Sequence, residues 1–241
     1  LPTRLKAWRE ASYQTPKAES FNVSKDGDKS IVKVTYRFPQ VDAQWEITYK
    51  VFANGIIKVD NRFVAEGTET PMIPRVGLRM QLSEILNDLT YYGRGPEENY
   101  RDRRTSQFIG EYTTPIKDLY EPYIRPQENE HRTDIYWCAL TTKQKAGLLF
   151  IADRTFELNA SNYLLGSLDS GETIDNGAPR TNETNHRHLT DPQPVKQVDM
   201  FIDYRMMGVG GDNSWGAIAH EPYLICLLYT SPSPRDRSVS R

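Results

Sequence analysis

The sequence predicts an all-β fold, a large antiparallel sandwich of two sheets, on three observations. Apolar and polar residues alternate from residue 31 to residue 64, which is the period of strands with one buried face. Glycine, proline and asparagine separate the apolar runs, as they do between the strands of a sandwich. The period of an amphipathic helix is scarce along the chain. The length allows one large domain or two small ones, and because large all-β units reach this size as one domain, we expect one domain over residues 1–225.

The predicted strands are taken from the alternating and apolar runs. The first run is IVKVTYRF at residues 31–38, and the second is WEITYKVF at residues 45–52. Their shared apolar face would hold Val32, Val34, Tyr36, Phe38, Trp45, Ile47, Tyr49 and Val51. Asn54-Gly55 predicts a hairpin with a type I′ turn, in which both central residues need positive φ. The return strand of this hairpin is IIKVDNRFV at residues 56–64. Further strands are predicted over residues 75–82, 89–92, 134–141, 147–153 and 198–205.

One short helix is predicted over residues 114–120, with Thr114 as the N-cap and Pro115 in the first helical position. Its apolar side would hold Ile116, Leu119 and Tyr120. The segment 169–194 is polar and rich in turn residues, so we expect it to form long loops.

The composition excludes two classes of partner. The 241 residues carry a net charge of −2 without a basic cluster before the tail, so no nucleic-acid partner is expected. No stretch approaches about 18 consecutive apolar residues, so no membrane partner is expected. Two cysteines, Cys138 and Cys226, cannot form a disulfide framework. The 14 tyrosines, 8 phenylalanines and 4 tryptophans suit β-sheets and sugar-binding surfaces alike.

The last residues, CLLYTSPSPRDRSVSR at 226–241, differ in composition from everything before them. Basic runs rich in serine and proline stay disordered. The stretch CLLYTSPSPRD also looks like one translated reading frame of a sequencing adapter. We therefore expect residues 226–241 to be an artefactual or disordered tail, outside the folded domain.

The stretch YYGRGPEENYRDRR at residues 91–104 alternates in charge after a glycine- and proline-containing turn. Glu97 and Glu98 could form the carboxylate pair of a glycosidase, which needs two carboxyl groups roughly 5–10 Å apart across a sugar. Adjacent residues of an extended chain, however, point to opposite faces. The pattern favours an ion-paired loop that fastens the edge of the sandwich.

A second dense stretch, YEPYIRPQENEHRTDIYW, covers residues 120–137. Its prolines exclude a helix. Four polar side chains here could bind sugar hydroxyls or satisfy backbone groups of a long loop, and the second interpretation is favoured. They are Gln127, Glu128, Asn129 and Arg132.

The stretch NHRH holds His186 and His188 two residues apart, so on a strand they would share a face and could bind a metal ion. Only four histidines occur in the chain and no further ligand is close in sequence, so a structural role is favoured. Asn182-Glu183-Thr184 matches the glycosylation sequon, which matters only in a eukaryotic secretory setting.

The stretch MMGVGGDNSWG at residues 206–216 predicts a tight loop with Trp215 at its tip. Gly210 and Gly211 allow backbone conformations that a Cβ atom would exclude. The side chains that can tie the turn to its own backbone are Asp212, Asn213 and Ser214. The indole either folds back onto the core or is held out as a platform for the flat face of a ligand.

In this order, the motifs resemble those of the C-terminal domain, or small chain, of β-galactosidases of glycoside hydrolase family 2. GRGPEENYRDR looks like the family's Gly-x-Gly-Pro-x-Glu-Asn-Tyr-x-Asp-Arg element. YIRPQENEHRTD is similar to its Tyr-x-x-Pro-x-Glu-Asn-x-x-Arg element, and NHRH and MGVGGDNSW follow in the family's order. The resemblance covers about residues 20–225 and implies a two-sheet sandwich of the galactose-mutarotase-like type, truncated at both ends.

The resemblance implies that the parent enzyme hydrolyses terminal β-D-galactose residues with retention, using glutamates on an upstream TIM barrel. No catalytic residue, metal ion or cofactor is then expected in this chain, and Mg²⁺ and Na⁺ would bind to the barrel. Trp215 would stack on the substrate sugar, supported by residues 210–214. The expected partners are the β-galactoside, the barrel and, in a homo-oligomer, further copies of the parent. The compartment, bacterial cytoplasm or periplasm, stays open.

Two other classes of function remain open from the sequence. A stand-alone carbohydrate-binding module would bind glycan on the sheet without catalysis. A mutarotase-like aldose epimerase would need an acid/base pair in one cavity, for which His131 and Glu128 are the only near candidates.

Overall fold

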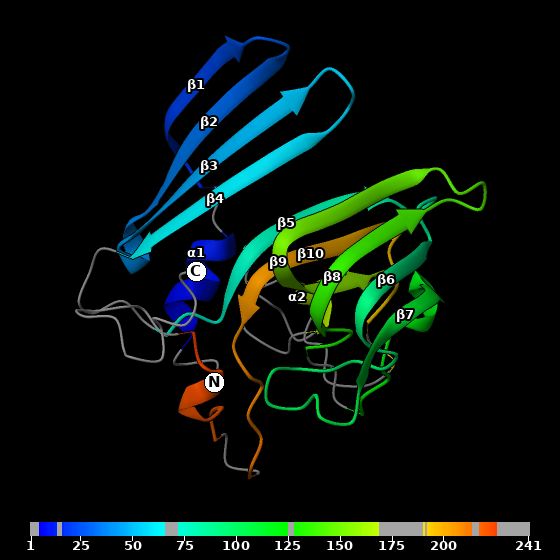
Figure 1. Cartoon of the computed structure of the whole chain (residues 1–241). Helices are drawn as coiled ribbons and strands as arrows, with labels where there is room; N and C mark the ends of the chain where they lie inside the picture. Colours follow the sequence, from blue (N-terminus) through cyan, green and yellow to red (C-terminus); the bar gives the residue numbers. More distant parts are fainter. Residues whose placement is uncertain are drawn as a thin grey trace. The chain divides into compact units, whose positions relative to one another are not determined.

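The structure of the chain is a computed structural model that describes residues 5–13, 16–65, 72–124, 128–168, 190, 192–213 and 217–225. These residues belong to two compact units, the first within Thr3–Ile73 and the second within Pro74–Ile225. The first unit holds a four-stranded sheet and the second a six-stranded sheet, both antiparallel (Figure 1). The predicted all-β class with two antiparallel sheets is confirmed. The single domain over residues 1–225 stays a prediction, and the tail lies outside the described residues.

The first unit is a meander, in which strands adjacent in the chain are adjacent in the sheet. Its elements are α1 (Lys6–Tyr13), β1 (Ala18–Asp26), β2 (Lys29–Phe38), a 3₁₀ turn (Pro39–Val41), β3 (Ala43–Phe52) and β4 (Ile57–Ala65). Val34 lies opposite Ile47 and Tyr36 lies opposite Trp45, so the predicted apolar residues of the two runs share a face. Strand β1, whose nine residues are all exposed, is not among the predicted strands.

The other face of this sheet is charged. Lys50 on β3 pairs with Asp60 on β4 at 2.8 Å, and Glu46 pairs with Arg62 at 3.1 Å. These are cross-strand pairs between side chains that the alternation places opposite the apolar face. The predicted division of β2 to β4 into an apolar and a polar face is therefore confirmed.

The hairpin predicted at Asn54-Gly55 joins β3 to β4, but the predicted type I′ turn is wrong. Gly55 has a φ of +87°, whereas Asn54 does not reach positive φ. The Gly55 N–H bonds to the Phe52 carbonyl at 3.0 Å, and the Phe52 N–H bonds to the Ile56 carbonyl at 2.9 Å. These bonds define a three-residue loop, a common alternative in which one glycine takes the left-handed position.

Helix α1, which the sequence analysis did not predict, packs on the sheet of its own unit. The Trp8 ring lies 6.0 Å from the Phe63 ring on β4, measured between centroids. Ala11 is buried with Val41 and Ala43, so one turn of the helix closes a small apolar cluster at the end of the meander. The helix is held by burial of one face rather than by its length.

The second unit has the strand order β5-β10-β9-β8-β6-β7. Its strands are β5 (Arg75–Ser83), β6 (Asp88–Gly95), β7 (Phe108–Pro115), β8 (Arg132–Thr141), β9 (Gly147–Ser161) and β10 (Gln197–Met206). Two 3₁₀ turns (Ile116–Asp118 and Glu221–Tyr223) and a short helix α2 (Leu165–Leu168) accompany them. All five strands predicted for this part of the chain are confirmed, and β7 is an additional edge strand.

The helix predicted over residues 114–120 is wrong. Thr114 and Pro115 end β7, and Pro115 is extended with φ −60° and ψ 138°. Only Ile116–Asp118 forms a single 3₁₀ turn. Ile116 and Leu119 are nevertheless buried, as the predicted apolar side requires, and they join the main core.

The core of the second unit lies on one face of the six-stranded sheet. Its buried members are Leu89, Tyr91, Ile116, Leu119, Ile135, Cys138, Leu140, Phe156, Leu158, Ala160, Val198 and Met200. Burial raises the pKa of the Cys138 thiol, which has no disulfide partner. Among the described residues, no helix is long and apolar enough to span a bilayer.

Gly77 on β5 should not tolerate a side chain, because it lies opposite Asp203 on β10. A Cβ atom at Gly77 would lie 2.6 Å from the Asp203 Cα and 2.6 Å from the Ile202 carbonyl oxygen. We expect Gly77→Ala to lower the free energy of unfolding by about 3 kcal/mol or more, as overpacking against backbone does.

Gly110→Ala on edge strand β7 is the matched control, since the three atoms nearest to its Cβ would all belong to the Tyr112 side chain, at 3.0 Å or more. Thermal unfolding of the two variants measures the difference. Equal melting temperatures would show that β5 and β10 are not packed as closely as described.

Candidate functional site

Three of the sequence motifs, as far as the structure describes them, meet at one end of the six-stranded sheet. The first loop, residues 96–107, joins β6 to β7, and the second segment, residues 128–134, consists of the residues before β8 and the first three residues of that strand. The Gly-Gly loop, residues 208–217, follows β10. Segments that are far apart in the sequence are thus brought together, and their polar side chains are buried where they meet.

Asn99 joins the first loop to the second segment and is fully buried. Its amide nitrogen donates to the backbone carbonyls of Arg94 at 3.1 Å and Glu97 at 3.0 Å. Its amide oxygen accepts from both the backbone N–H and the hydroxyl of Thr133, at 3.0 and 2.6 Å. The Asn99 backbone N–H also donates to the His131 carbonyl at 2.7 Å. The side chain therefore has its full set of four hydrogen bonds.

Ion pairs fasten the same junction. The Asp134 carboxylate, at the start of β8, accepts hydrogen bonds from the guanidinium groups of Arg94 and Arg104, each at 2.7 Å between nitrogen and oxygen. Glu98 accepts the Glu130 backbone N–H at 2.8 Å and the hydroxyls of Tyr100 and Tyr123. Glu98 thus holds the loop through hydrogen bonds, and the ion pairs favoured from the sequence are those of Arg94 and Arg104 with Asp134.

Glu97 points to solvent, and its backbone N–H bonds to the Gln107 side chain at 3.1 Å. Glu97 and Glu98 therefore have different surroundings, one exposed and one joined to tyrosines. The structure does not bring them together as two carboxyl groups facing one space.

His131 lies at the centre of a second buried group. Its ring stacks on Tyr100, with 5.3 Å between centroids and 16° between planes. Its two nitrogens lie 2.7 Å from the Asn159 amide oxygen and 3.3 Å from a Glu157 carboxylate oxygen. Glu128 instead pairs with Arg75 at 3.2 Å. The two residues considered as the acid/base pair of an epimerase therefore bind different partners and do not pair with each other. His131 is also only 1% exposed.

The polar residues of the second segment mainly satisfy backbone groups. Asn129 exchanges two hydrogen bonds with the backbone of Glu121, at 2.9 and 2.7 Å. Arg132 donates to the carbonyls of Glu130 at 2.8 Å and Pro96 at 3.1 Å. These contacts match the interpretation favoured over sugar binding. Gln127 lies outside the described residues.

Arg75 ties strands β5 and β10 to this group. Its guanidinium donates to the Asn159 side chain at 2.7 Å and approaches the Asp203 carboxylate at 2.9 Å. Burial raises the pKa of Asp203, and the Arg75 charge opposes that shift. No local pattern predicts this pairing, because Arg75 begins the first strand of the unit and Asp203 lies in its last strand.

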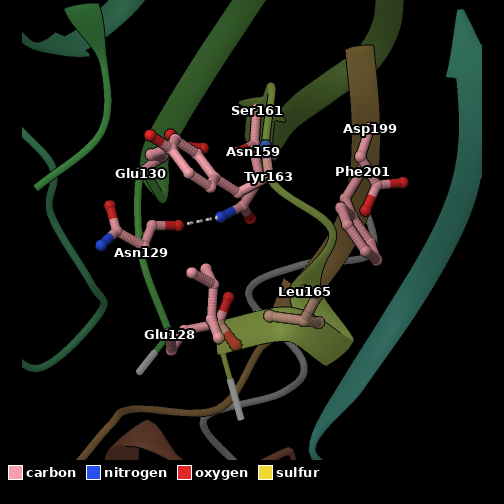
Figure 2. A pocket seen from close by; sticks show the side chains of 10 residues that line it. Glu128, Asn129, Glu130, Asn159, Ser161, Tyr163, Leu165, Asp199 and Phe201 are labelled. Carbon is pink, nitrogen blue, oxygen red and sulfur yellow. Dashed lines mark hydrogen bonds between the residues drawn. The ribbon is translucent and has the colours of Figure 1, made fainter. Parts of the chain in front are cut away.

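A small hollow opens beside the buried group (Figure 2). Its lining residues are Glu128, Asn129, Glu130, Asn159, Ser161, Tyr163, Leu165, Leu168, Asp199 and Phe201. Asp199 is neutralised by Arg79, which donates to both carboxylate oxygens at 2.8 and 2.9 Å. Within the described parts of the chain, no three acidic, histidine or cysteine side chains are placed to hold a metal ion.

Glu130 is the unusual member of the hollow. It has a φ of +62°, it is 2% exposed, and its Oε1 atom has no hydrogen-bond partner. Burial raises the pKa of Glu130 to about 8, with Glu98 and Asp199 adding to the shift and Ser161 and Arg132 opposing it. The carboxyl group is therefore protonated near neutral pH.

The base of the Gly-Gly loop is held by its own backbone. Gly210 and Gly211 have φ values of +70° and +96°, as the sequence predicted for this turn. The Gly211 N–H bonds to the Ala217 carbonyl at 3.3 Å, and the Ala217 N–H bonds to the Asn213 side chain at 3.3 Å. Asp212 contacts His220. Ser214 and Trp215, like His186 and His188, lie outside the described residues.

One residue of this site was missed as a loop support. The Asp102 carboxylate accepts the backbone N–H groups of Val209 and Gly210, at 3.1 and 2.8 Å. Its partners lie 107 and 108 residues further along the chain, so no local pattern could have identified it. The signal available in the sequence was only that Asp102 belongs to one motif and the glycines to another.

Comparison with known proteins gives one family for the chain. Residues 2–230 match the family described as β-galactosidase small chain. The match includes residues 226–230, the first five residues of the predicted tail.

Three β-galactosidases are among the similar curated proteins. The chain is 30% identical to that of Priestia megaterium over 225 residues, 28% to that of Streptococcus thermophilus over 228, and 31% to that of Lactobacillus delbrueckii subsp. bulgaricus over 226. The matched part is 92–93% of this chain and 20% of each relative. The chain thus spans about a fifth of the length of these relatives.

Glu130 should make the stability of the chain fall as the pH rises. The carboxyl group is protonated in the folded chain up to about pH 8 but ionises near its ordinary value of 4.5 on unfolding. The free energy of unfolding is therefore not lowered by Glu130 below about pH 4.5, where the group is protonated in both states. It falls progressively from there up to about pH 8, because only the unfolded chain releases the proton in this interval. Glu130→Gln, which stays neutral, should become increasingly stabilising relative to the native chain across this interval.

Melting temperatures of both proteins between pH 4.5 and pH 9 measure this difference, and Glu84→Gln, at an exposed position, is the control. The difference between Glu130→Gln and the native chain should level off above about pH 8. A difference that is constant across the whole range would contradict a buried, protonated Glu130.

Proposed function

Because the chain belongs to the β-galactosidase small-chain family, we propose that it is the C-terminal part of a retaining β-galactosidase of glycoside hydrolase family 2. The substrate of the parent enzyme would be a terminal, non-reducing β-D-galactose residue. The proposal is supported by relatives that are named β-galactosidase and of which the chain covers about 20%. The catalytic glutamate pair would then lie on the upstream TIM barrel.

In this proposal the domain completes the active site with Trp215. The observation that carries it is the restrained base of the Gly-Gly loop, where Gly211 and Ala217 are hydrogen-bonded on either side of the tryptophan. An indole face suits a pyranose, because the C–H bonds of the sugar meet the negative face of the ring and apolar area is buried. Residues 210–214 support the ring in this role.

Metal ions and assembly enter the proposal only through the parent enzyme. The residues that would hold Mg²⁺ and Na⁺ belong to the barrel, and the domain would meet the barrel and further copies of the parent. The epimerase alternative gains no support from His131 and Glu128, since each has another partner. An activity and binding experiment distinguishes a stand-alone carbohydrate-binding module from a fragment of a β-galactosidase.

The purified 241-residue chain should hydrolyse no β-galactoside, because both carboxyl groups needed for glycoside hydrolysis would lie outside it. Extending the gene upstream and adding the encoded barrel portion should restore activity on a chromogenic β-galactoside. Turnover by the chain alone, free of host enzyme, would defeat the proposal. Glycan binding by the chain without restoration of activity would instead indicate a binding module.

Trp215→Ala in the completed enzyme should raise KM without unfolding the domain. The loss of one stacked face should cost about 1–3 kcal/mol, which is roughly a five- to 150-fold change. Trp45→Ala is the matched control, because Trp45 packs edge-on against Phe63 at 6.2 Å and bonds to Asn61. That variant should lower the melting temperature and leave KM unchanged. The opposite result for Trp215 would place its ring in the core.

A further inference from the structure

Asp102 is the carboxylate of the first loop that faces the Gly-Gly loop. Both partners recorded for its oxygens among the described residues are backbone N–H groups, those of Val209 and Gly210. Each oxygen accepts one of them. Bonds from an ionised carboxylate to N–H groups are stronger than bonds between neutral groups, and two bonds from one rigid group fix a direction as well as a distance.

Asp102 itself is held on a rigid base. Tyr100 and Arg103, which flank the turn formed by Arg101 and Asp102, exchange two backbone hydrogen bonds at 3.1 and 2.8 Å. The Tyr100 ring stacks on the buried His131 ring. The Arg103 guanidinium lies over the same Tyr100 ring, 5.6 Å from its centroid. The carboxylate is therefore carried by the same junction that Asn99 closes.

The Gly-Gly loop is pressed against this carboxylate. A Cβ atom on Gly208 would lie 2.6 Å from the Asp102 Cγ, and one on Gly210 would lie 2.5 Å from the Ala217 carbonyl oxygen. The Gly208 N–H is bonded to the Tyr223 carbonyl at 2.8 Å. The backbone of the loop thus has contacts on both sides as it leaves β10, and the contact with Asp102 is made by a carboxylate of another loop.

We propose that Asp102 is a positioning residue, which sets the direction of the Gly-Gly loop and hence the place at which Trp215 meets the sugar. This inference rests on the proposed role of Trp215 as a sugar platform. Asp102 does not touch the substrate in this scheme and acts through residues 209–215. Asparagine could accept only one of the two N–H groups and would turn its own NH₂ toward the other.

The anchor is tested first on the 241-residue chain by amide hydrogen exchange, which needs no activity. Asp102→Asn should speed exchange at Val209 and Gly210 by about tenfold or more, because a charge-assisted bond that resists local opening is lost. Asp60→Asn, which breaks an ion pair in the first unit, should leave these two amides unchanged. Unchanged exchange in Asp102→Asn would overturn the inference.

The consequence for the sugar is tested in the completed enzyme by a double-mutant cycle. Asp102→Asn should raise KM, and in the Trp215→Ala background it should add nothing, because the ring through which it acts has gone. Additive effects on KM would show that Asp102 acts elsewhere and would overturn the inference.

The two levels of proposal fail in different ways. If Trp215→Ala leaves KM unchanged, the platform role fails and the inference about the sugar falls with it, even where exchange at Val209 and Gly210 responds. If Trp215→Ala raises KM while Asp102→Asn leaves exchange and KM unchanged, the platform role stands and only the inference falls.

Discussion

Four hydrogen bonds to one buried amide, that of Asn99, determine how the irregular segments of the second unit meet. A buried polar group without partners would cost about 1–3 kcal/mol, so this side chain is favourable only in the geometry that satisfies all four bonds. That geometry fixes the first loop against residues 131–133. The Asp134 ion pairs, the Tyr100–His131 stack and the Asp102 contact all depend on the same alignment.

Much of the fold could be predicted from the sequence because its information is local. Val34 and Ile47 belong to runs with a period of two, so the alternation alone assigns both to the apolar face that they share across β2 and β3. Strand β1 was missed because all of its residues are exposed, so its sequence carries no record of a buried face. The helix predicted at Pro115 failed because proline suits the end of a strand as well as the start of a helix.

The site was less predictable, since its contacts join residues far apart in the chain. The resemblance identified the motifs, and the choice between catalytic and structural carboxylates could be argued from adjacency alone. The stack of Tyr100 on His131 and the pairing of Arg75 with Asp203 depend on strand order, which no motif contains. The left-handed Glu130 is likewise invisible in the sequence, because glutamate is not a residue expected at positive φ.

The separation of 108 residues between Asp102 and Gly210 also bears on how the chain folds. Contacts that close long loops lose the most chain entropy, so they form after the local hairpins have assembled. The Gly-Gly loop therefore acquires its geometry late, once β10 has paired with β5 and β9. During synthesis, the contact of Asp102 with Val209 and Gly210 therefore forms only when nearly the whole unit is native, so this contact reports the completion of folding.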